Sequence, residues 1–356
     1  MKTLLAQLQV KFVVTLFTII LCASTFDINA SQALPTKNAS QVKLTQLSTA
    51  EGLSQSYVFS IVQDKRGFIW VATADGLNRY DGFEFVHYRH NIENPNTITD
   101  NYIRKLFIDS KGTLWVGTGN GLSRYNEEFD NFTNYLHIDG DDTSLTDNVI
   151  WDISEGEIIN DMNEKVDSLL VSTEYGLHKF DETTRKFSKI SFKNIPKGIE
   201  AIKTIYQDEN KAFWLGTFSD GIYIVDQQLS QAKHLKDSTF ENLTVTADSM
   251  FDMKFINENY WLATSNGVYV ISSDYKIIKH FTTNSTNGVL ASNEVRSIIS
   301  TSLNEATLGT KSGLFKVNLN NYSISQQNIS FQNSPLASSH IEQPWILSVF
   351  EDNNSG

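Results

Sequence analysis

The sequence predicts an all-β fold, a β-propeller built from four-stranded blades, and three observations support this prediction. A block of residues recurs every 45 to 55 positions, with its clearest copies at residues 64–80 and 109–125. Each copy combines short apolar runs with glycine-bearing turns, a pattern typical of propellers in which every repeat forms one blade. A chain of 356 residues that is 40% hydrophobic is long enough to bury the core of such an array.

Two landmarks count the blades. The first is the glycine of each central turn, at Gly76, Gly121, Gly176, Gly221, Gly267 and Gly313, with spacings of 45, 55, 45, 46 and 46 residues. The second is the threonine that precedes each turn, at Thr73, Thr118, Thr173, Thr217, Thr264 and Thr310. Because both landmarks keep the same register, we expect six complete blades.

Each block predicts four strands in the order of the chain. In the first block we expect them at residues 58–62, 68–73, 77–80 and 83–88. The first strand ends at a turn in which Asp64 accepts backbone hydrogen bonds and Gly67 adopts a positive φ. The second strand is apolar on both faces because a blade packs between two neighbours. A Thr-x-x-Gly turn then leads into the third strand.

Several blades are preceded by a similar four-residue segment, which we call the lead-in loop. Its copies are residues 53–56, 98–101, 145–148 and 290–293. A later copy near Ile341 predicts the first strand of a seventh blade at residues 346–350, so the propeller spans residues 42–356 with an incomplete seventh blade at 341–356. Residues 42–47 would supply its outer strand and cover an open edge. We interpret the chain as an N-terminal fragment; the alternative is a six-bladed ring with an unpaired tail.

The first 30 residues have the order of a secretory signal peptide. Lys2 and Lys11 precede the apolar run 12–23, and small and polar residues follow up to Ala30. This run is short for a membrane span, although an uncleaved anchor is the alternative. Residues 31–41 are a linker. We therefore expect an exported, periplasmic protein that meets the membrane only through this segment or through regions outside the chain.

Net charge limits the binding partners, and cysteine content bears on the compartment. The net charge is -12 and the pI is about 5.0, so no basic stripe is available for nucleic acid. The single cysteine, Cys22, lies within the signal segment. A mature chain without cysteine is compatible with an oxidising compartment.

The repeated string resembles the two-component regulator propeller repeat. It reads Asp-x-x-Gly-x-Ile/Leu-Trp-Val-Gly/Ala-Thr-x-x-Gly-Leu-x-Arg-Tyr in residues 64–80 and 109–125, and the resemblance extends loosely over residues 45–356. Leu170 and Thr307 replace the tryptophan in the third and sixth blocks. The resemblance implies the periplasmic sensor region of a bacterial membrane sensor. Such proteins carry a histidine kinase or diguanylate cyclase in regions outside this chain, and a homodimer formed through those regions is a further expectation.

Most residues that attract attention have a structural interpretation. Trp70, Trp115, Trp214 and Trp261 share one repeat position, so we expect them to pack between blades. The loop 117–121 repeats a blade turn and precedes a strand, which disfavours a phosphate site. The carboxylates of residues 139–142 lack the spacing of a calcium loop, and the histidines form no zinc motif. We expect no catalytic residues, metal or cofactor.

One set of residues supports a sharper hypothesis. The second position of each first strand, where the lead-in loops meet the central channel, is occupied by Phe59, Arg104, Trp151, Lys203, Phe251, Arg296 and Leu347. Aromatic and cationic side chains converging on one channel mouth suit an oligosaccharide, particularly an acidic one. The alternative is that each side chain packs against or pairs with the adjacent blade.

These observations favour a non-catalytic, extracytoplasmic ligand-sensing domain. Two other classes stay open from the sequence. Propellers also host enzymes that act on polysaccharides, and they also serve as protein-binding scaffolds.

Overall fold

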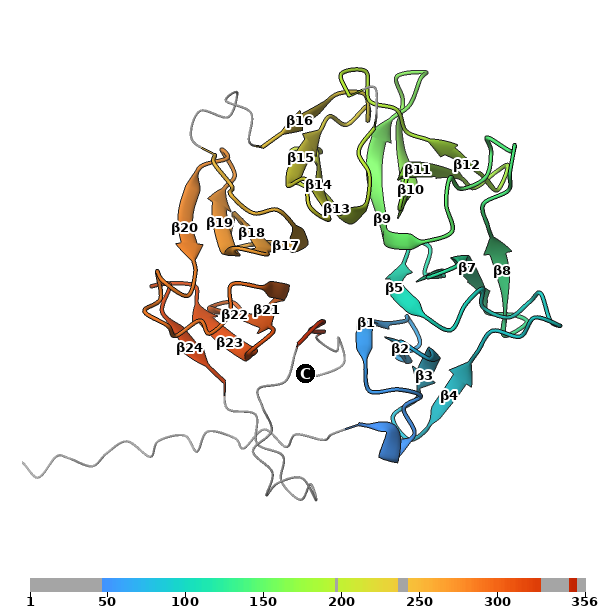
Figure 1. Ribbon diagram of the computed structural model, residues 1–356, viewed down its shortest axis with the longest axis horizontal. Coiled ribbons are helices and arrows are strands. Elements are labelled where there is room, and N and C mark those ends of the chain that lie inside the picture. The colour runs from blue at the N-terminus through green and yellow to red at the C-terminus, as the bar shows by residue number, and fades with distance from the viewer. Residues whose placement is uncertain (1–46, 196–197, 236–242, 328–345, 351–356) are drawn as a thin grey trace, which may run out of the picture. The chain divides into compact units, whose positions relative to one another are not determined.

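The computed structural model describes residues 47–195, 198–235, 243–327 and 346–350. The chain divides into residues 1–45 and 46–356, and all described residues lie in the second unit. They form six antiparallel sheets of four strands each, arranged as a propeller (Figure 1). The predicted fold class is confirmed. The predicted signal peptide, linker and, apart from Leu47, closing strand lie outside the described residues.

The strands of the first three blades follow the order of the chain. Blade 1 contains β1 (Val58–Gln63), β2 (Ile69–Thr73), β3 (Gly76–Tyr80) and β4 (Phe85–Tyr88). Blade 2 contains β5 (Ile103–Ile108), β6 (Leu114–Thr118), β7 (Gly121–Asn126) and β8 (Asn131–Tyr135). Blade 3 contains β9 (Ile150–Ile159), β10 (Lys165–Thr173), β11 (Gly176–Asp181) and β12 (Lys186–Lys189).

The next three blades have the same order. Blade 4 contains β13 (Ile202–Gln207), β14 (Phe213–Thr217), β15 (Ile222–Val225) and β16 (Ala232–His234). Blade 5 contains β17 (Met250–Ile256), β18 (Asn259–Thr264), β19 (Gly267–Ser272) and β20 (Ile277–Phe281). Blade 6 contains β21 (Val295–Ser302), β22 (Glu305–Thr310), β23 (Gly313–Asn318) and β24 (Ile324–Gln326). Apart from the 3₁₀ turn η1 (Thr49–Glu51), the described part of the chain contains no helix.

The first strand of every blade is the innermost, so β1, β5, β9, β13, β17 and β21 surround the central channel (Figure 1). Each blade runs from its first strand outward to its fourth through consecutive antiparallel pairs. The second strands are the most deeply buried, and all five residues of β6 and of β14 are buried. This agrees with a strand that packs on both faces.

The repeated tryptophans are core residues, as predicted. Trp70, Trp115, Trp214 and Trp261 are at most 1% exposed. In blade 2 the Nε1 of Trp115 donates to Asp109 at 2.9 Å, and Asp64 and Asp208 make the same bond in blades 1 and 4. The same aspartates accept backbone amides of the turn that follows the first strand. The repeated aspartate therefore stabilises the turn between the first two strands, and the repeated tryptophan fills the core.

In the lead-in loop of blade 2, each of the four residues makes a defined contact. Ile98 is fully buried. The hydroxyls of Thr99 and Thr118 lie 2.9 Å apart, and Asp100 accepts the amide of Tyr102. The carbonyl of Asn101 accepts the amide of Gly76 in the preceding blade at 2.7 Å. The loop thus ties each blade to the threonine of its own central turn and to the blade before it.

Residues 346–350 pack against blade 6 but are not a strand, which corrects the expected strand at this position. The amide of Ile346 donates to Thr310 at 2.9 Å, and the amide of Val349 donates to Ser297 at 3.1 Å. A Cβ built on Gly309 would lie 2.7 Å from Ile346, as one on Gly117 would from Ile150, the first residue of β9. The segment therefore occupies the place of a first strand. The described residues include no second strand to pair with it.

The fourth strand of blade 1 begins later than predicted. We expected it from Phe83, but β4 begins at Phe85. The carboxylate of Asp81 accepts the amides of Phe83 and Glu84, which closes a turn and leaves Phe83 93% exposed. An Asp side chain that bonds its own backbone in this way competes with strand pairing.

Candidate functional site

A β-bulge at the start of every first strand creates the candidate site. In each blade the pairing between the first and second strands skips the second residue of the first strand. The six skipped residues are Phe59, Arg104, Trp151, Lys203, Phe251 and Arg296. A bulge frees one residue from the ladder and redirects its side chain. The repeat therefore supplies a fixed backbone device and leaves the side chain at that position free to vary.

These six residues and Leu347 line one pocket of about 340 Å³ at the mouth of the central channel. All seven residues that the sequence placed at the mouth are brought together. The volume is within the range of small-molecule sites. We call this pocket the channel mouth.

Both arginines of the channel mouth lie over aromatic rings of the same pocket. The guanidinium of Arg104 is 4.2 Å from the ring centroid of Trp151, and that of Arg296 is 3.9 Å from Phe251. The Nε atoms of both arginines are buried and have no hydrogen-bond partner among the described residues. Each arginine is therefore held in position by a ring, so that packing on an adjacent blade accounts for part of its environment.

Lys203 lies between two rings and two arginines. Its Nζ is 4.5 Å from the ring centroid of Trp151 and 3.8 Å from that of Phe218. Burial, together with the charges of Arg296 and Arg104, lowers the pKa of Lys203 to about 8. A cation whose charged form is disfavoured in this way gains from the arrival of a negative charge.

Four further residues lie beside the channel mouth and were not identified from the sequence: Tyr102, Glu174, Glu294 and Lys311, which we call the outer ring. Glu174 accepts the Nε1 of Trp151 at 2.7 Å, while Glu294 pairs with Arg296 and with Lys311 at 2.5 Å. Tyr102 lies 5.0 Å from the guanidinium of Arg104. Tyr102 and Glu294 directly precede a first strand, and Glu174 and Lys311 begin a central turn. In blades 2 and 6, the backbone amide at the start of the central turn donates to the carbonyl of the residue that precedes the first strand. The pairing of these two positions in the repeat was the sequence signal that could have identified the outer ring.

The two sides of the channel mouth differ in chemistry. On the blade 1 side, Phe59 packs against Tyr57 and Tyr102 with centroid distances of 5.4 and 5.1 Å. Tyr57 and Tyr102 are 43% and 37% exposed. Next to this aromatic group is Arg104, and farther around the channel mouth are Lys203 and Arg296. Arg104 and Lys203 form no ion pair with any described residue, whereas Arg296 is paired with Glu294. The site offers apolar ring faces beside unbalanced positive charge.

Comparison with known proteins matches two segments of the chain to a family model. The family model described as two component regulator propeller matches residues 52–75 and 97–120. Two segments of this chain carry that repeat. Histidine kinase P4 of Formosa agariphila is 53% identical over 49 residues, which are 14% of this chain and 4% of that protein. The resemblance expected from the sequence is confirmed for these segments.

Solved structures resemble a larger part of this chain. A chain described as the extracellular domain of a hybrid two component system of B. thetaiotaomicron has a TM-score of 0.65 and 25% identity, covering 80% of this chain and 37% of that one. The extracellular domain of a one component system of the same organism has a TM-score of 0.62 and 20% identity, covering 81% and 38%. This chain therefore spans less than two-fifths of either. Across the described ranges, no helix has the length and apolarity needed to span a bilayer.

Proposed function

We propose that this chain is an exported, non-catalytic sensing domain whose channel mouth binds an acidic oligosaccharide. The observation that carries the proposal is the set of bulge residues, which brings three cations and three aromatic rings into one pocket. The solved relatives, described as extracellular domains of signalling systems, support a periplasmic location and a sensing role. Kinase or cyclase activity is assigned to regions outside this chain.

The charges of the site favour an anionic ligand. Arg104 and Lys203 have no carboxylate partner among the described residues, and Arg296 shares Glu294 with Lys311. Each unbalanced cation can form a charge-assisted hydrogen bond, and the rings beside it exclude water from that bond. A ligand carboxylate that replaces the missing counter-charge is stabilised more than a neutral group at the same place.

The aromatic side of the site favours a sugar. The ring of Phe59 contacts the rings of Tyr57 and Tyr102, and both tyrosines are partly exposed. Aromatic faces bury the apolar face of a flat ligand and leave its hydroxyls free to bond. The carboxylates of Glu174 and Glu294 belong to the outer ring and can accept hydrogen bonds from sugar hydroxyls. Signalling then requires only that the ligand bind one sensor state more tightly than another.

Calorimetric titration of the full chain with uronate oligosaccharides tests the proposal. The control ligand is the same oligosaccharide after its carboxylates have been reduced to alcohols. We expect binding of the acidic form and a loss of about 100-fold for the reduced form, because two charge-assisted contacts disappear.

The double variant Arg104→Ala/Arg296→Ala should lose affinity by a similar factor. The control variant is Arg79→Ala, whose side chain bonds Tyr125 and Asp130 in the outer part of the propeller. Unchanged binding of an acidic oligosaccharide by the double variant would show that the channel mouth is not its site.

A further inference from the structure

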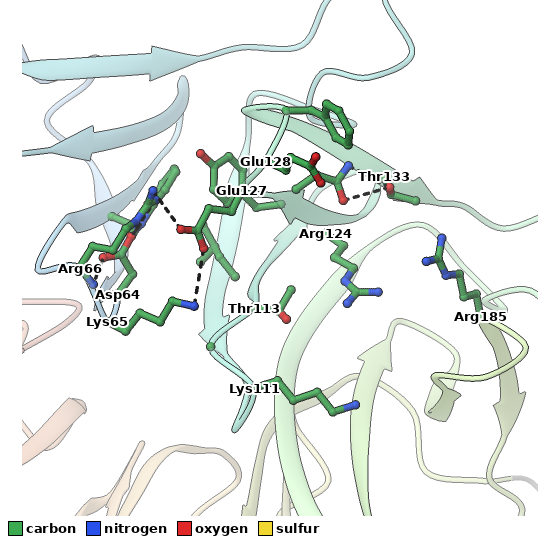
Figure 2. A pocket seen from close by; sticks show the side chains of 16 residues that line it. Asp64, Lys65, Arg66, Lys111, Thr113, Arg124, Glu127, Glu128, Thr133 and Arg185 are labelled. Carbon is green, nitrogen blue, oxygen red and sulfur yellow. Dashed lines mark hydrogen bonds and ion pairs between the residues drawn. The ribbon is translucent and has the colours of Figure 1, made fainter.

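A second pocket lies on the face of the propeller opposite the channel mouth. It has a volume of about 530 Å³ and is lined mainly by the turns that follow first and third strands, including residues 64–66, 111–114 and 124–129. First strands begin at the channel mouth and end at these turns, so the two pockets are at opposite ends of β1 and β5. Arg185 extends to the same pocket from the corresponding turn of blade 3. We call it the turn pocket (Figure 2).

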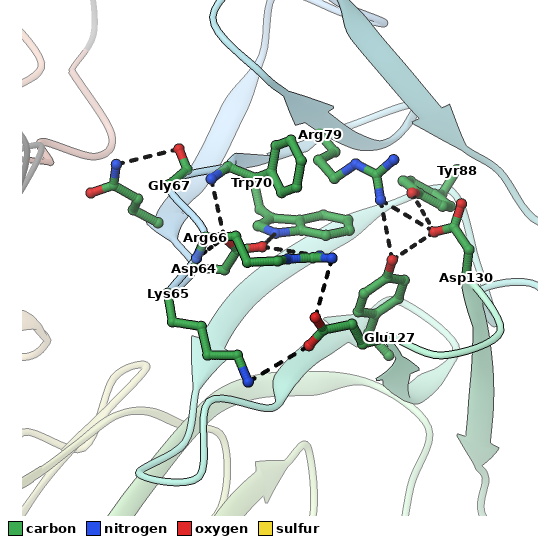
Figure 3. Close-up of polar contacts among 12 residues, drawn as sticks. Asp64, Lys65, Arg66, Gly67, Trp70, Arg79, Tyr88, Glu127 and Asp130 are labelled. Atoms are coloured by element: carbon green, nitrogen blue, oxygen red, sulfur yellow. Dashed lines mark hydrogen bonds and ion pairs between the residues drawn. The ribbon is translucent and has the colours of Figure 1, made fainter.

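One side of the turn pocket is internally neutralised. Glu127 pairs with Arg66 at 3.2 Å and with Lys65 at 3.8 Å (Figure 3). Arg66 also lies 3.5 Å from Asp64, whose carboxylate holds the Nε1 of Trp70. These groups join blades 1 and 2 and already have partners.

The other side carries three cations, Lys111, Arg124 and Arg185, of which only Arg124 forms an ion pair with a described residue. Figure 2 draws Lys111, Arg124 and Arg185 away from the Asp64 side of the pocket. The side chains of Lys111 and Arg185 form no ion pair or hydrogen bond with any described residue. Arg124 pairs with Glu182 at 3.1 Å and lies over Trp115. Burial raises the pKa of Tyr135, and the charges of Arg124 and Arg185 oppose that rise.

The charge balance of the whole lining is also positive. Its five cations are Lys65, Arg66, Lys111, Arg124 and Arg185, and its three carboxylates are Asp64, Glu127 and Glu128. The lining thus has a formal excess of two positive charges, or of one when Glu182, the partner of Arg124, is included, although the chain has a net charge of -12. An excess of this kind at one concave place attracts anions to it.

The geometry points to a binding site for a divalent tetrahedral oxyanion, a sulfate or phosphate group, held between Lys111, Arg124 and Arg185. Two unpaired cations match a charge of about two, and guanidinium forks donate to adjacent oxygens of such a group. Thr113 and Thr133 also line the pocket and have hydroxyls that can donate to a further oxygen. The site does not depend on the proposed function of the channel mouth, because the two share no residue.

Equilibrium dialysis of the full chain with radiolabelled inorganic sulfate, at constant ionic strength set by sodium chloride, tests this site. A parallel series uses inorganic phosphate, so that the two anion chemistries are ranked. We expect one saturable site, with an affinity about tenfold lower in the Lys111→Gln/Arg185→Gln variant, because each lost contact is worth a modest, partly screened free energy.

Two matched controls decide the outcome. Lys65→Gln removes a cation of the same pocket that is already paired with Glu127, and it should change sulfate binding by less than about twofold. Arg104→Ala/Arg296→Ala alters only the opposite face and should leave sulfate binding unchanged. Non-saturable binding, or equal losses in Lys65→Gln and Lys111→Gln/Arg185→Gln, would overturn the site. Loss of sulfate binding in the channel-mouth variant would relocate it.

Discussion

The central turns and the bulge positions lie in the same blades but have different surroundings. At the turns, Thr118 bonds Thr99 and the carbonyl of Gly121, and equivalent threonines do so in other blades. At the bulges, Arg104 and Lys203 contact rings but have no ionic partner among the described residues. The turn threonines are buried and hydrogen-bonded, whereas these two bulge residues are only partly buried and form no ion pair with a described residue. Repetition in this chain marks packing, and variation at a fixed backbone position marks the candidate site.

The two tryptophans of neighbouring blades allow the largest test of this difference. Trp115 is 1% exposed and bonded to Asp109, so Trp115→Ala should lower the free energy of unfolding by about 3–5 kcal/mol. Trp151 is only partly buried at the channel mouth, so Trp151→Ala should cost about 1–2 kcal/mol. Urea unfolding measures both. Equal losses would contradict the distinction between scaffold and site.

A smaller effect is expected at the threonine of a central turn. Thr118→Val keeps the shape but removes a hydroxyl that donates to Gly121 and accepts the amide of Asn120. The variant should lose about 2 kcal/mol of unfolding free energy, because buried groups are left without partners. Ligand affinity should not change.

The control for that variant is Thr143→Val, because the hydroxyl of Thr143 bonds the exposed Asp141. It should cost less than about 0.5 kcal/mol. If both variants are equally stable, the turn threonines do not contribute as described.

The pH dependence of binding gives the smallest expected effect. Since the pKa of Lys203 is about 8, its ammonium form is lost as the pH rises through 8, and an anionic ligand loses its partner. Affinity for an acidic oligosaccharide should therefore fall by about tenfold between pH 7 and pH 10. In Lys203→Arg the charge persists, so calorimetry should show a flat profile over this range. A flat profile in the unsubstituted chain would exclude Lys203 as a ligand contact.

The same shift affects stability with a defined sign. The pKa of folded Lys203 lies below its ordinary value of 10.5, so the unfolded chain holds more protons between pH 8 and pH 10.5. The contribution of Lys203 to unfolding free energy consequently rises with pH in that window. Ligand binding and stability should thus respond to pH in opposite directions.

The sequence was sufficient for the parts that repeat. The turn glycines and threonines counted six blades, and the position of each first strand identified every residue that lines the channel mouth. The outer ring was missed because Glu174 begins a central turn and Glu294 directly precedes a first strand, two kinds of position that only the folded blade brings together. The turn pocket was missed for the same reason, since Lys111 and Arg185 come from turns of different blades and Arg124 comes from β7.

The repeat pattern also could not predict local departures from the repeat. Trp261 keeps the repeated ring, but Phe255 occupies the position of the bonding aspartate of blades 1, 2 and 4. The Nε1 of Trp261 therefore has no partner among the described residues. The turn at Asp81 shortened β4 because a side-chain bond replaced strand pairing. Such effects depend on single hydrogen bonds rather than on period.

A crystal structure of the full chain with a uronate oligosaccharide tests the central claim most directly. The account predicts a ligand carboxylate bonded to Arg104 or Lys203 and a sugar ring against Phe59 or Tyr102, with the bulge backbone unchanged. An oligosaccharide bound elsewhere, with the channel mouth unoccupied at saturating ligand, would contradict the claim that the residues varying between blades form the sensing site.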